Sequence, residues 1–390
     1  MPTVQRLWKP VALVAALVVI VVNVHREYGP LKVRAAQPAP WADEPCKEDG
    51  GRFKLTAQSR VLVTGGAGFI GSSLMAALAA RETKPEAVVG VDNFNPYYSP
   101  AYKFARAKRL KLEFALDVVR GDVCNATLLE DLFAKHRFTH VVHLAAQAGV
   151  RYSLTHPMSY VKNNVECYVA LLEVMIKQPA RPAFAYASSS SVYGLNTKIP
   201  FSETDAVTNP ANLYGATKFM NEQISKSYNH IYQLRSVGLR FFTVYGPWGR
   251  PDMAAWLFTR AIEQGKPLTL YNRGEMRRDF TYIDDIVSGI IGAVQYCADK
   301  PAVFNLGNNQ PVELMKFIET IELELGQKAS LRHKISTAEI KETFADIDKA
   351  KALLGYDPKI SMEVGLKNFI AWYKAEPRRN NFAGGLFNER

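Results

Sequence analysis

Two side chains four residues apart, Tyr214 and Lys218, could perform acid–base chemistry in this chain of 390 residues. Residues at this spacing lie one turn apart on the same helix face, so the ammonium can hold the phenol's pKa down toward neutrality. Four serines, Ser188 to Ser191, follow an apolar stretch at 183–187 that is typical of a strand. Ser189 can share the substrate's reacting oxygen with the tyrosine. We therefore predict Tyr214, Lys218 and Ser189 as catalytic residues, although a Tyr-x-x-x-Lys alone is a common coincidence on helices.

A glycine-rich turn near the start of the globular part predicts a partner for this chemistry. Gly65, Gly68 and Gly71 follow an apolar stretch at 60–64 and open an expected helix. The first glycine allows a sharp turn, the second lets the backbone approach a pyrophosphate, and the third lets helix and strand pack closely. The next expected strand ends at Asp92, which can accept both ribose hydroxyls but would repel a 2′-phosphate. The pattern predicts NAD rather than NADP.

Residues after the third expected strand, at 115–120, and the fourth, at 139–144, complete the predicted cofactor site. Asp122 can accept from an adenine amino group, and an exposed turn aspartate is an equal interpretation of it. Small residues after the strand at 139–144 let a flat cofactor lie against the backbone, whereas His143 is interpreted as a core or strand-end histidine. The predicted cofactor-binding residues are Gly65, Gly68, Phe69, Ile70, Gly71, Asp92, Asn93, Asp122, Val123, Leu144, Ala145 and Ala146, together with Tyr214 and Lys218.

Strands that alternate with helical stretches predict an α/β fold with a Rossmann-like, doubly wound parallel sheet. One of these helices is expected over 157–176. We expect the NAD-binding domain at 58–245 and a smaller C-terminal α/β substrate-binding domain at 246–378, interleaved with it. Residues 379–390 are expected to form a C-terminal tail. Ahead of these parts we expect a cytosolic tail with a membrane anchor at 1–27, and a Pro- and Ala-rich stem linker at 28–57.

The apolar run from Val11 to Val24 predicts a membrane-targeting segment. It is shorter than the roughly 20 residues that a helix needs to span a bilayer. A cleaved signal peptide, with its cleavage region near Ala35, is therefore the alternative. The flanking charges do not decide the orientation.

Composition and cysteine usage narrow the function classes. The chain is 48% hydrophobic and 22% charged, and 48 Lys and Arg against 37 Asp and Glu give a net charge of +11. This excess suits an anionic ligand, while the absence of a basic run argues against nucleic acid. The four cysteines have no metal-ligand spacing, so no metal site is predicted. Cys124, Cys167 and Cys297 are predicted as packed thiols, and Cys46 as a free thiol with pairing between chains as the alternative.

Taken together, these motifs resemble the extended short-chain dehydrogenase/reductases that modify nucleotide sugars. Within that family the chain is most similar to the plant-type UDP-glucuronate 4-epimerases, in residues 92–98, 143–151, 187–198, 241–254 and 278–287. The resemblance implies interconversion of UDP-glucuronate and UDP-galacturonate on tightly held NAD. It also implies a homodimer formed through helices that include the one carrying Tyr214 and Lys218. With the apolar segment, it implies a single-pass Golgi membrane protein whose catalytic domain is lumenal.

Five further residues are predicted to contact the UDP-uronic acid. Ser190 and Ser191 stand where related decarboxylases and dehydratases carry an acidic residue, and hydroxyls can bind a carboxylate without repelling it. Thr243 is added with Arg250 as a carboxylate or substrate contact, and Arg250 and Arg278 are the best-placed cations for a diphosphate or carboxylate. Solvated loop arginines are the alternative interpretation of the last two.

Two sequence features depart from the family pattern, and three alternative functions are considered. Ser336–Glu339 differs from the basic residue and Gly-Asp usual in the family, and Asn125 begins a glycosylation sequon that we expect to be unmodified. The enzymatic alternatives are a UDP-glucuronate decarboxylase and a UDP-glucose/galactose 4-epimerase. The non-enzymatic alternative is an inactive regulatory protein that binds NAD or a nucleotide sugar.

Overall fold

The computed structural model describes residues 53–271, 274–297, 300–334, 342–377 and 379–382. The predicted membrane anchor, most of the stem, Cys46 and Ser336–Glu339 lie outside the described residues. Within the described part of the chain, no helix combines the length and apolar character needed to cross a bilayer.

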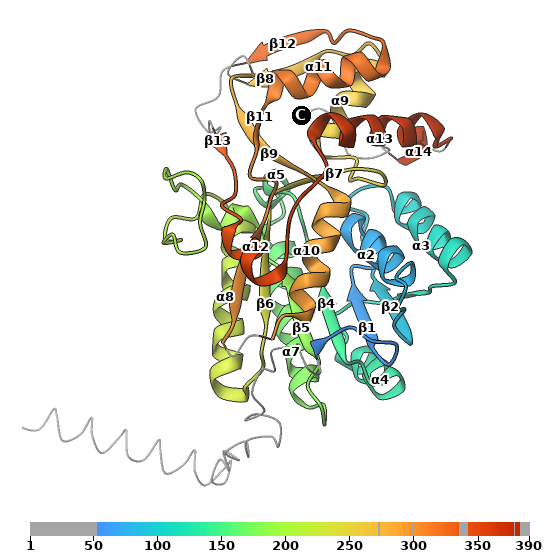
Figure 1. Ribbon diagram of the computed structural model, residues 1–390, viewed down its shortest axis with the longest axis vertical. Helices are drawn as coiled ribbons and strands as arrows, with labels where there is room; N and C mark the ends of the chain where they lie inside the picture. The colour runs from blue at the N-terminus through green and yellow to red at the C-terminus, as the bar shows by residue number, and fades with distance from the viewer. Residues whose placement is uncertain (1–52, 272–273, 298–299, 335–341, 378, 383–390) are drawn as a thin grey trace, which may run out of the picture. The chain divides into compact units, whose positions relative to one another are not determined.

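A parallel sheet of seven strands forms the centre of the larger part of the fold (Figure 1). Its order, β10-β6-β5-β4-β1-β2-β3, runs outward in both directions from the β1–β4 pair. β4 and β6 are buried along their whole length, as expected of strands covered on both faces. The strands are β1 (Arg60–Thr64), β2 (Ala87–Asp92), β3 (Val118–Arg120), β4 (His140–His143), β5 (Ala183–Ala187), β6 (Val237–Phe241) and β10 (Ala302–Leu306). The predicted Rossmann-like sheet is confirmed.

Helices cover both faces of this sheet, and alternate side chains of β1 pack into different clusters. Val61 and Val63 belong to the cluster that contains apolar residues of α2 and α10, whereas Leu62 belongs to the cluster of α4 and α7. This alternation is the period of two expected of a strand. The main covering helices are α2 (Phe69–Ala79), α3 (Pro100–Phe114), α4 (Ala126–His136), α7 (Cys167–Ile176), α8 (Leu213–Tyr232) and α10 (Ile283–Gln295).

A second, smaller α/β part follows, also as predicted. Strand β9 pairs with β7, β11 and β13 in a mixed four-stranded sheet, and β8 pairs with β12. β10 follows β9 in sequence but lies in the large sheet, whereas β7 follows β6 of the large sheet but lies in the small one. The strands are β7 (Thr243–Tyr245), β8 (Leu268–Tyr271), β9 (Arg277–Tyr282), β11 (Pro311–Glu313), β12 (Leu331–Lys334) and β13 (Glu342–Thr343). The helices are α9 (Ala254–Glu263), α11 (Leu314–Leu325), α12 (Asp348–Leu354), α13 (Met362–Ala375) and α14 (Arg379–Phe382).

Two predicted elements differ in detail from the structure. The third strand is shorter at its start: α3 ends at Phe114 and is capped by Ala115 in a left-handed conformation with φ 56°, so β3 begins only at Val118. The helix expected over 157–176 is divided into α6 (Pro157–Tyr160), the π-helical turn η2 (Val161–Glu166) and α7. Such π turns are rare and are frequent at functional sites.

The prediction of packed thiols at Cys124 and Cys167 is wrong, because the two sulfurs form a disulfide. Cys124 lies in the turn after β3 and Cys167 begins α7, and their Cα atoms are 4.2 Å apart. Cys297 is also disulfide-bonded, so the same correction applies to it. Asp122, Cys124 and Cys167 bring three groups of metal-ligand type together, but the disulfide already uses two of them.

The Cys124–Cys167 bond should stabilise the fold strongly, since it closes a loop with a sequence separation of 43 residues. In the chain-entropy account, replacing both cysteines by serine lowers the free energy of unfolding by about 4 kcal/mol. Urea unfolding of the double variant and of the wild type measures this difference. Peptide mapping without reductant is the control, and free thiols at both positions in the wild type would contradict the assignment.

Candidate active site

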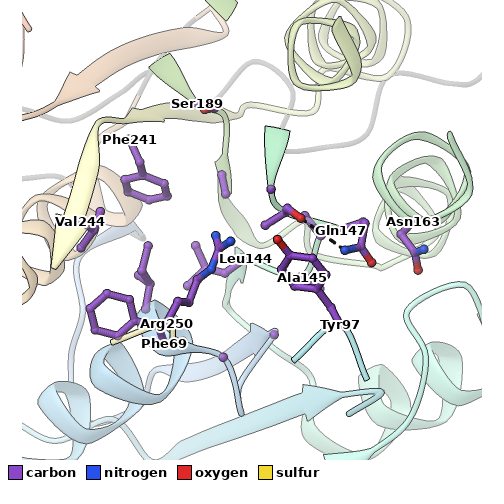
Figure 2. A pocket seen from close by; sticks show the side chains of 18 of the residues that line it. Phe69, Tyr97, Leu144, Ala145, Gln147, Asn163, Ser189, Phe241, Val244 and Arg250 are labelled. Atoms are coloured by element: carbon purple, nitrogen blue, oxygen red, sulfur yellow. Dashed lines mark hydrogen bonds between the residues drawn. The ribbon is translucent and has the colours of Figure 1, made fainter. Parts of the chain in front are cut away.

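A cavity of about 410 Å³ lies at the carboxyl ends of the central strands (Figure 2). The strand order reverses between β1 and β4, which leaves a crevice between the flanking helices at that edge. All three predicted catalytic residues, Ser189, Tyr214 and Lys218, line it. So do the predicted residues Gly65, Gly68, Phe69, Ile70, Gly71, Asp92, Asn93, Val123, Leu144, Ala145, Ala146, Ser190, Ser191, Thr243 and Arg250.

Two predicted residues, Asp122 and Arg278, are not among those that line the cavity. Asp122 accepts hydrogen bonds from the backbone N–H of Cys124 and the side-chain amide of Asn93, at 2.9 and 3.1 Å. Arg278 donates to the carbonyl of Arg277 at 3.0 Å. Their contacts with adenine and diphosphate stay predictions.

The glycine turn has the geometry that a bound pyrophosphate requires. Gly65 has φ +72°, and a Cβ on Gly71 would lie 2.1 Å from the Gly65 carbonyl oxygen, so the close approach of helix and strand requires glycine there. Helix α2 begins at Phe69, and its N-cap, Gly68, offers no side-chain cap. The first amides of α2 therefore remain available to an anion in the cavity.

Asp92 is held at the end of β2 by a network that sequence reasoning found only in part. Its carboxylate accepts from the backbone N–H of Ala67 at 3.2 Å and of Phe94 at 2.8 Å. The buried ammonium of Lys103 lies 3.5 Å from Asp92 Oδ1. Lys103 was not among the residues predicted from the sequence. Its place next to apolar residues of α3 such as Tyr102 could have indicated a buried cation.

Lys218 and Tyr214 have the predicted proximity to the serine run. The Lys218 ammonium donates to the Ala187 carbonyl at 2.8 Å, and burial lowers its pKa to about 7. The pKa of Tyr214, by contrast, is raised: burial outweighs the lowering by the charge of Arg250 and the hydroxyl of Ser189. Proximity to Lys218 alone therefore does not make Tyr214 a ready base, in contrast to the expectation from spacing.

A buried network behind the cavity supports the start of the serine run. Its members Glu222 and Arg240 were not predicted from the sequence. Ser188 donates to Glu222 Oε1 at 2.6 Å, and Arg240 donates to both oxygens of Glu222 at 2.9 and 2.8 Å. The side chains of Arg240 and Glu222 are 4% and 2% exposed. Because Glu222 lies four residues after Lys218 in α8, both face the end of β5.

His143 and Asn164 have positioning contacts rather than exposed reactive groups. His143 Nδ1 shares a hydrogen bond with the Thr64 hydroxyl at 2.8 Å, and burial together with the charge of Lys218 lowers its pKa to about 3. It is therefore neutral at physiological pH. Asn164, in the π turn, accepts from the N–H of Gln147 at 2.7 Å and donates to Thr217 at 3.0 Å. It thereby joins the loop after β4 to α8.

Comparisons with known proteins agree with this geometry. Residues 61–307 match the model of the NAD dependent epimerase/dehydratase family. UDP-glucuronate 4-epimerase 3 of Arabidopsis thaliana is 48% identical over 339 residues, which cover 83% of this chain and 78% of that protein. Protein CapI of Staphylococcus aureus is 40% identical over 337 residues, covering 80% and 98%.

Solved structures give the same result. The UDP-glucuronic acid 4-epimerase from Bacillus cereus, in complex with UDP-glucuronic acid and NAD, superposes with a TM-score of 0.74 at 35% identity. The match covers 81% of this chain and 99% of that one. The UDP-glucose 4-epimerase from Thermotoga maritima, with UDP-glucose, gives a TM-score of 0.73 at 28% identity, covering 81% and 99%.

The Glu222–Arg240 pair gives a testable prediction for the support of the serine run. Glu222→Gln leaves the Arg240 charge buried without its carboxylate, so the free energy of unfolding should fall by about 3 kcal/mol. Removing both charges, with Glu222→Leu and Arg240→Met together, should recover most of this loss. Urea unfolding measures both variants, and a double variant no more stable than the single one would contradict the explanation.

Proposed function

The chain belongs to the NAD-dependent epimerase/dehydratase family, and we propose that it is a UDP-glucuronate 4-epimerase that interconverts UDP-glucuronate and UDP-galacturonate. The observation that carries this proposal is that Ser189, Tyr214 and Lys218 line the same cavity as the glycine turn. With a dinucleotide bound beside such a base, one carbon of a sugar could be oxidised by hydride transfer to the dinucleotide and reduced again by its return, without consuming an external oxidant.

The residues present fit NAD as the cofactor. The uncapped start of α2 suits the pyrophosphate, and the carboxylate of Asp92 suits the hydroxyls of a ribose without a 2′-phosphate. When bound, NAD would supply the acceptor for the hydride from C4. The charge of Arg250 and the Ser189 hydroxyl favour the phenolate of Tyr214, against the larger effect of burial on its pKa. We propose that the ammonium form of Lys218, one helix turn away, acts in the same direction.

The chain's own residues then move one proton and hold one oxygen. Tyr214 takes the proton of the 4-hydroxyl, and Ser189 hydrogen-bonds the same oxygen. Both line the cavity, so they can reach one substrate atom together. The product of this half-reaction is a 4-keto sugar. Rotation of that sugar about its diphosphate linkage presents its other face, and return of the hydride inverts C4.

The residues around the substrate carboxylate favour epimerisation over decarboxylation. A 4-keto uronate is a β-keto acid, which loses carbon dioxide when the bond from C5 to the carboxylate aligns with the ketone. Ser190, Ser191 and Thr243 line the cavity with neutral hydroxyls, and Arg250 adds a cation. Together they can bind the carboxylate without placing an acid or base at C5. Arg278 is proposed as a contact of the diphosphate or the carboxylate.

The Golgi membrane location, with a single-pass anchor and a lumenal catalytic domain, is a further proposal. The apolar run at 11–24 supports the anchor. The disulfide between Cys124 and Cys167 supports an oxidising compartment, because cytosolic thiols are kept reduced. Protease treatment of sealed Golgi vesicles tests this arrangement: the catalytic domain should be protected until detergent is added.

We also propose a homodimer formed through α8 and the helices beside it. Leu154, Met158 and Met220 are 74%, 74% and 46% exposed, and they lie on or next to α5 (Val150–Ser153), α6 and α8, which pack together. Such exposed apolar groups on adjoining elements are typical of a protein interface, and a second copy of the chain fits the family's implied dimer. Sedimentation of the purified protein at twice the monomer mass would support it.

Product analysis tests the proposed reaction. Purified protein with UDP-glucuronate and no added NAD should form UDP-galacturonate, and Tyr214→Phe should lower turnover at least about 100-fold because the base is lost. Binding of UDP should remain in this variant. A pentose or no UDP-galacturonate from the wild type would favour the enzymatic alternatives, and binding without any turnover would favour the regulatory one. Undiminished turnover in Tyr214→Phe would mean that another group is the base.

A further inference from the structure

Arg250 reaches into the cavity (Figure 2). Most of its guanidinium is already held by the carboxylate of Asp252. Its Nε donates to Asp252 Oδ1 at 3.0 Å and its Nη2 to Asp252 Oδ2 at 2.6 Å. Among the described residues, nothing accepts a hydrogen bond from the remaining nitrogen, Nη1. This two-point pairing fixes the plane of the guanidinium and leaves one nitrogen for an anionic group of the substrate.

Asp252 is in turn held by Tyr97, whose hydroxyl donates to Asp252 Oδ2 at 2.9 Å. Burial disfavours the Asp252 carboxylate, but the Arg250 charge and the hydrogen bonds from Arg250 and Tyr97 outweigh it and keep its pKa below the usual value. The carboxylate therefore stays charged and paired at neutral pH. Tyr97 itself packs edge-on against Tyr152, with ring centroids 4.9 Å apart.

Tyr97 belongs to the segment that follows β2, which also lines the cavity on the side of the predicted cofactor site. It follows Asp92 by five residues, and its backbone N–H donates to the Asn95 side chain at 2.8 Å. Arg106, later in the same segment, donates to the Trp248 carbonyl at 3.1 and 2.6 Å. The loop that carries Arg250 is thus attached at two places to the segment after β2.

We propose that Tyr97 is a positioning residue that fixes Arg250 through Asp252 and so keeps the carboxylate on the 4-keto intermediate. The inference rests on the proposed epimerase function. Without the Tyr97 hydroxyl, Asp252 and Arg250 remain paired but can turn together. Nη1 then holds the substrate anion less firmly, and the carboxylate samples the alignment with the ketone that releases carbon dioxide.

The escape reaction balances with the groups already present. The 4-hydroxyl gives its proton to Tyr214 and C4 gives its hydride to NAD, so the sugar is oxidised and the cofactor reduced. The bond from C5 to the carboxyl carbon then breaks, its electron pair stays on C5 and is protonated from water, and carbon dioxide leaves. UDP-4-keto-pentose is released, and the hydride stays on the cofactor. Each escape therefore ends the turnover of that enzyme molecule.

Tyr97→Phe tests the proposal through the ratio of carbon dioxide to UDP-galacturonate formed from UDP-glucuronate. The variant should raise this ratio at least about tenfold, because a hydrogen bond to a charged pair is lost. Its NAD content after purification should equal that of the wild type. Tyr152→Phe is the matched control: it removes a neighbouring hydroxyl with no part in the Asp252 network and should leave the ratio unchanged.

A double-variant cycle separates positioning from direct substrate contact. If Tyr97 acts through Asp252, Asp252→Asn should raise the ratio by itself, and Tyr97→Phe added to it should have little further effect. A wild-type ratio in Tyr97→Phe, or fully independent effects of the two changes, would overturn the proposal. Asp252→Asn alone serves if Tyr97→Phe does not fold. Absence of UDP-galacturonate from the wild type would instead overturn the proposed function.

Discussion

The burial of Lys218 against the end of β5 is the constraint on which the site depends. Its ammonium donates to the Ala187 carbonyl, so α8 is attached directly ahead of the serine run. Tyr214, one helix turn before Lys218, lines the cavity. Glu222, one turn after Lys218, accepts a hydrogen bond from the Ser188 hydroxyl. A single helix face thus places the base and supports the serines, at the cost of a lysine whose pKa is lowered to about 7.

Charge around the substrate is arranged by pairing, so that the cations stay fixed while the reacting sugar turns. Arg250 is paired with Asp252, and the buried Arg106 donates to the carbonyls of Trp248 and Ala67 at 2.6 and 3.3 Å. Ala67 belongs to the glycine turn and Trp248 to the substrate loop. A side chain that binds both limits their relative movement, which suits a reaction in which one carbon must be oxidised and reduced from opposite faces.

The disulfide adds a covalent link at the adenine side of the predicted cofactor site. Cys124 lies two residues after Asp122, and Cys167 begins the helix that follows the π turn. The bond therefore ties the loop after β3 to the chain segment that carries Asn164. This helps to explain how a loop with one short strand before it is held in place beside the cavity.

Much of the site could be predicted from the sequence because its signals are local. A strand, glycine turn and helix lie within about twenty residues, and Tyr214 and Lys218 share a helix face whatever the rest of the chain does. Pairings across the fold could not be predicted: Tyr97 with Asp252, Lys103 with Asp92, Glu222 with Arg240, and Cys124 with Cys167. They depend on which strands are neighbours and which loops meet at the sheet edge. Tertiary burial likewise decided that the pKa of Tyr214 rises, since only the folded chain determines how much water reaches the phenol.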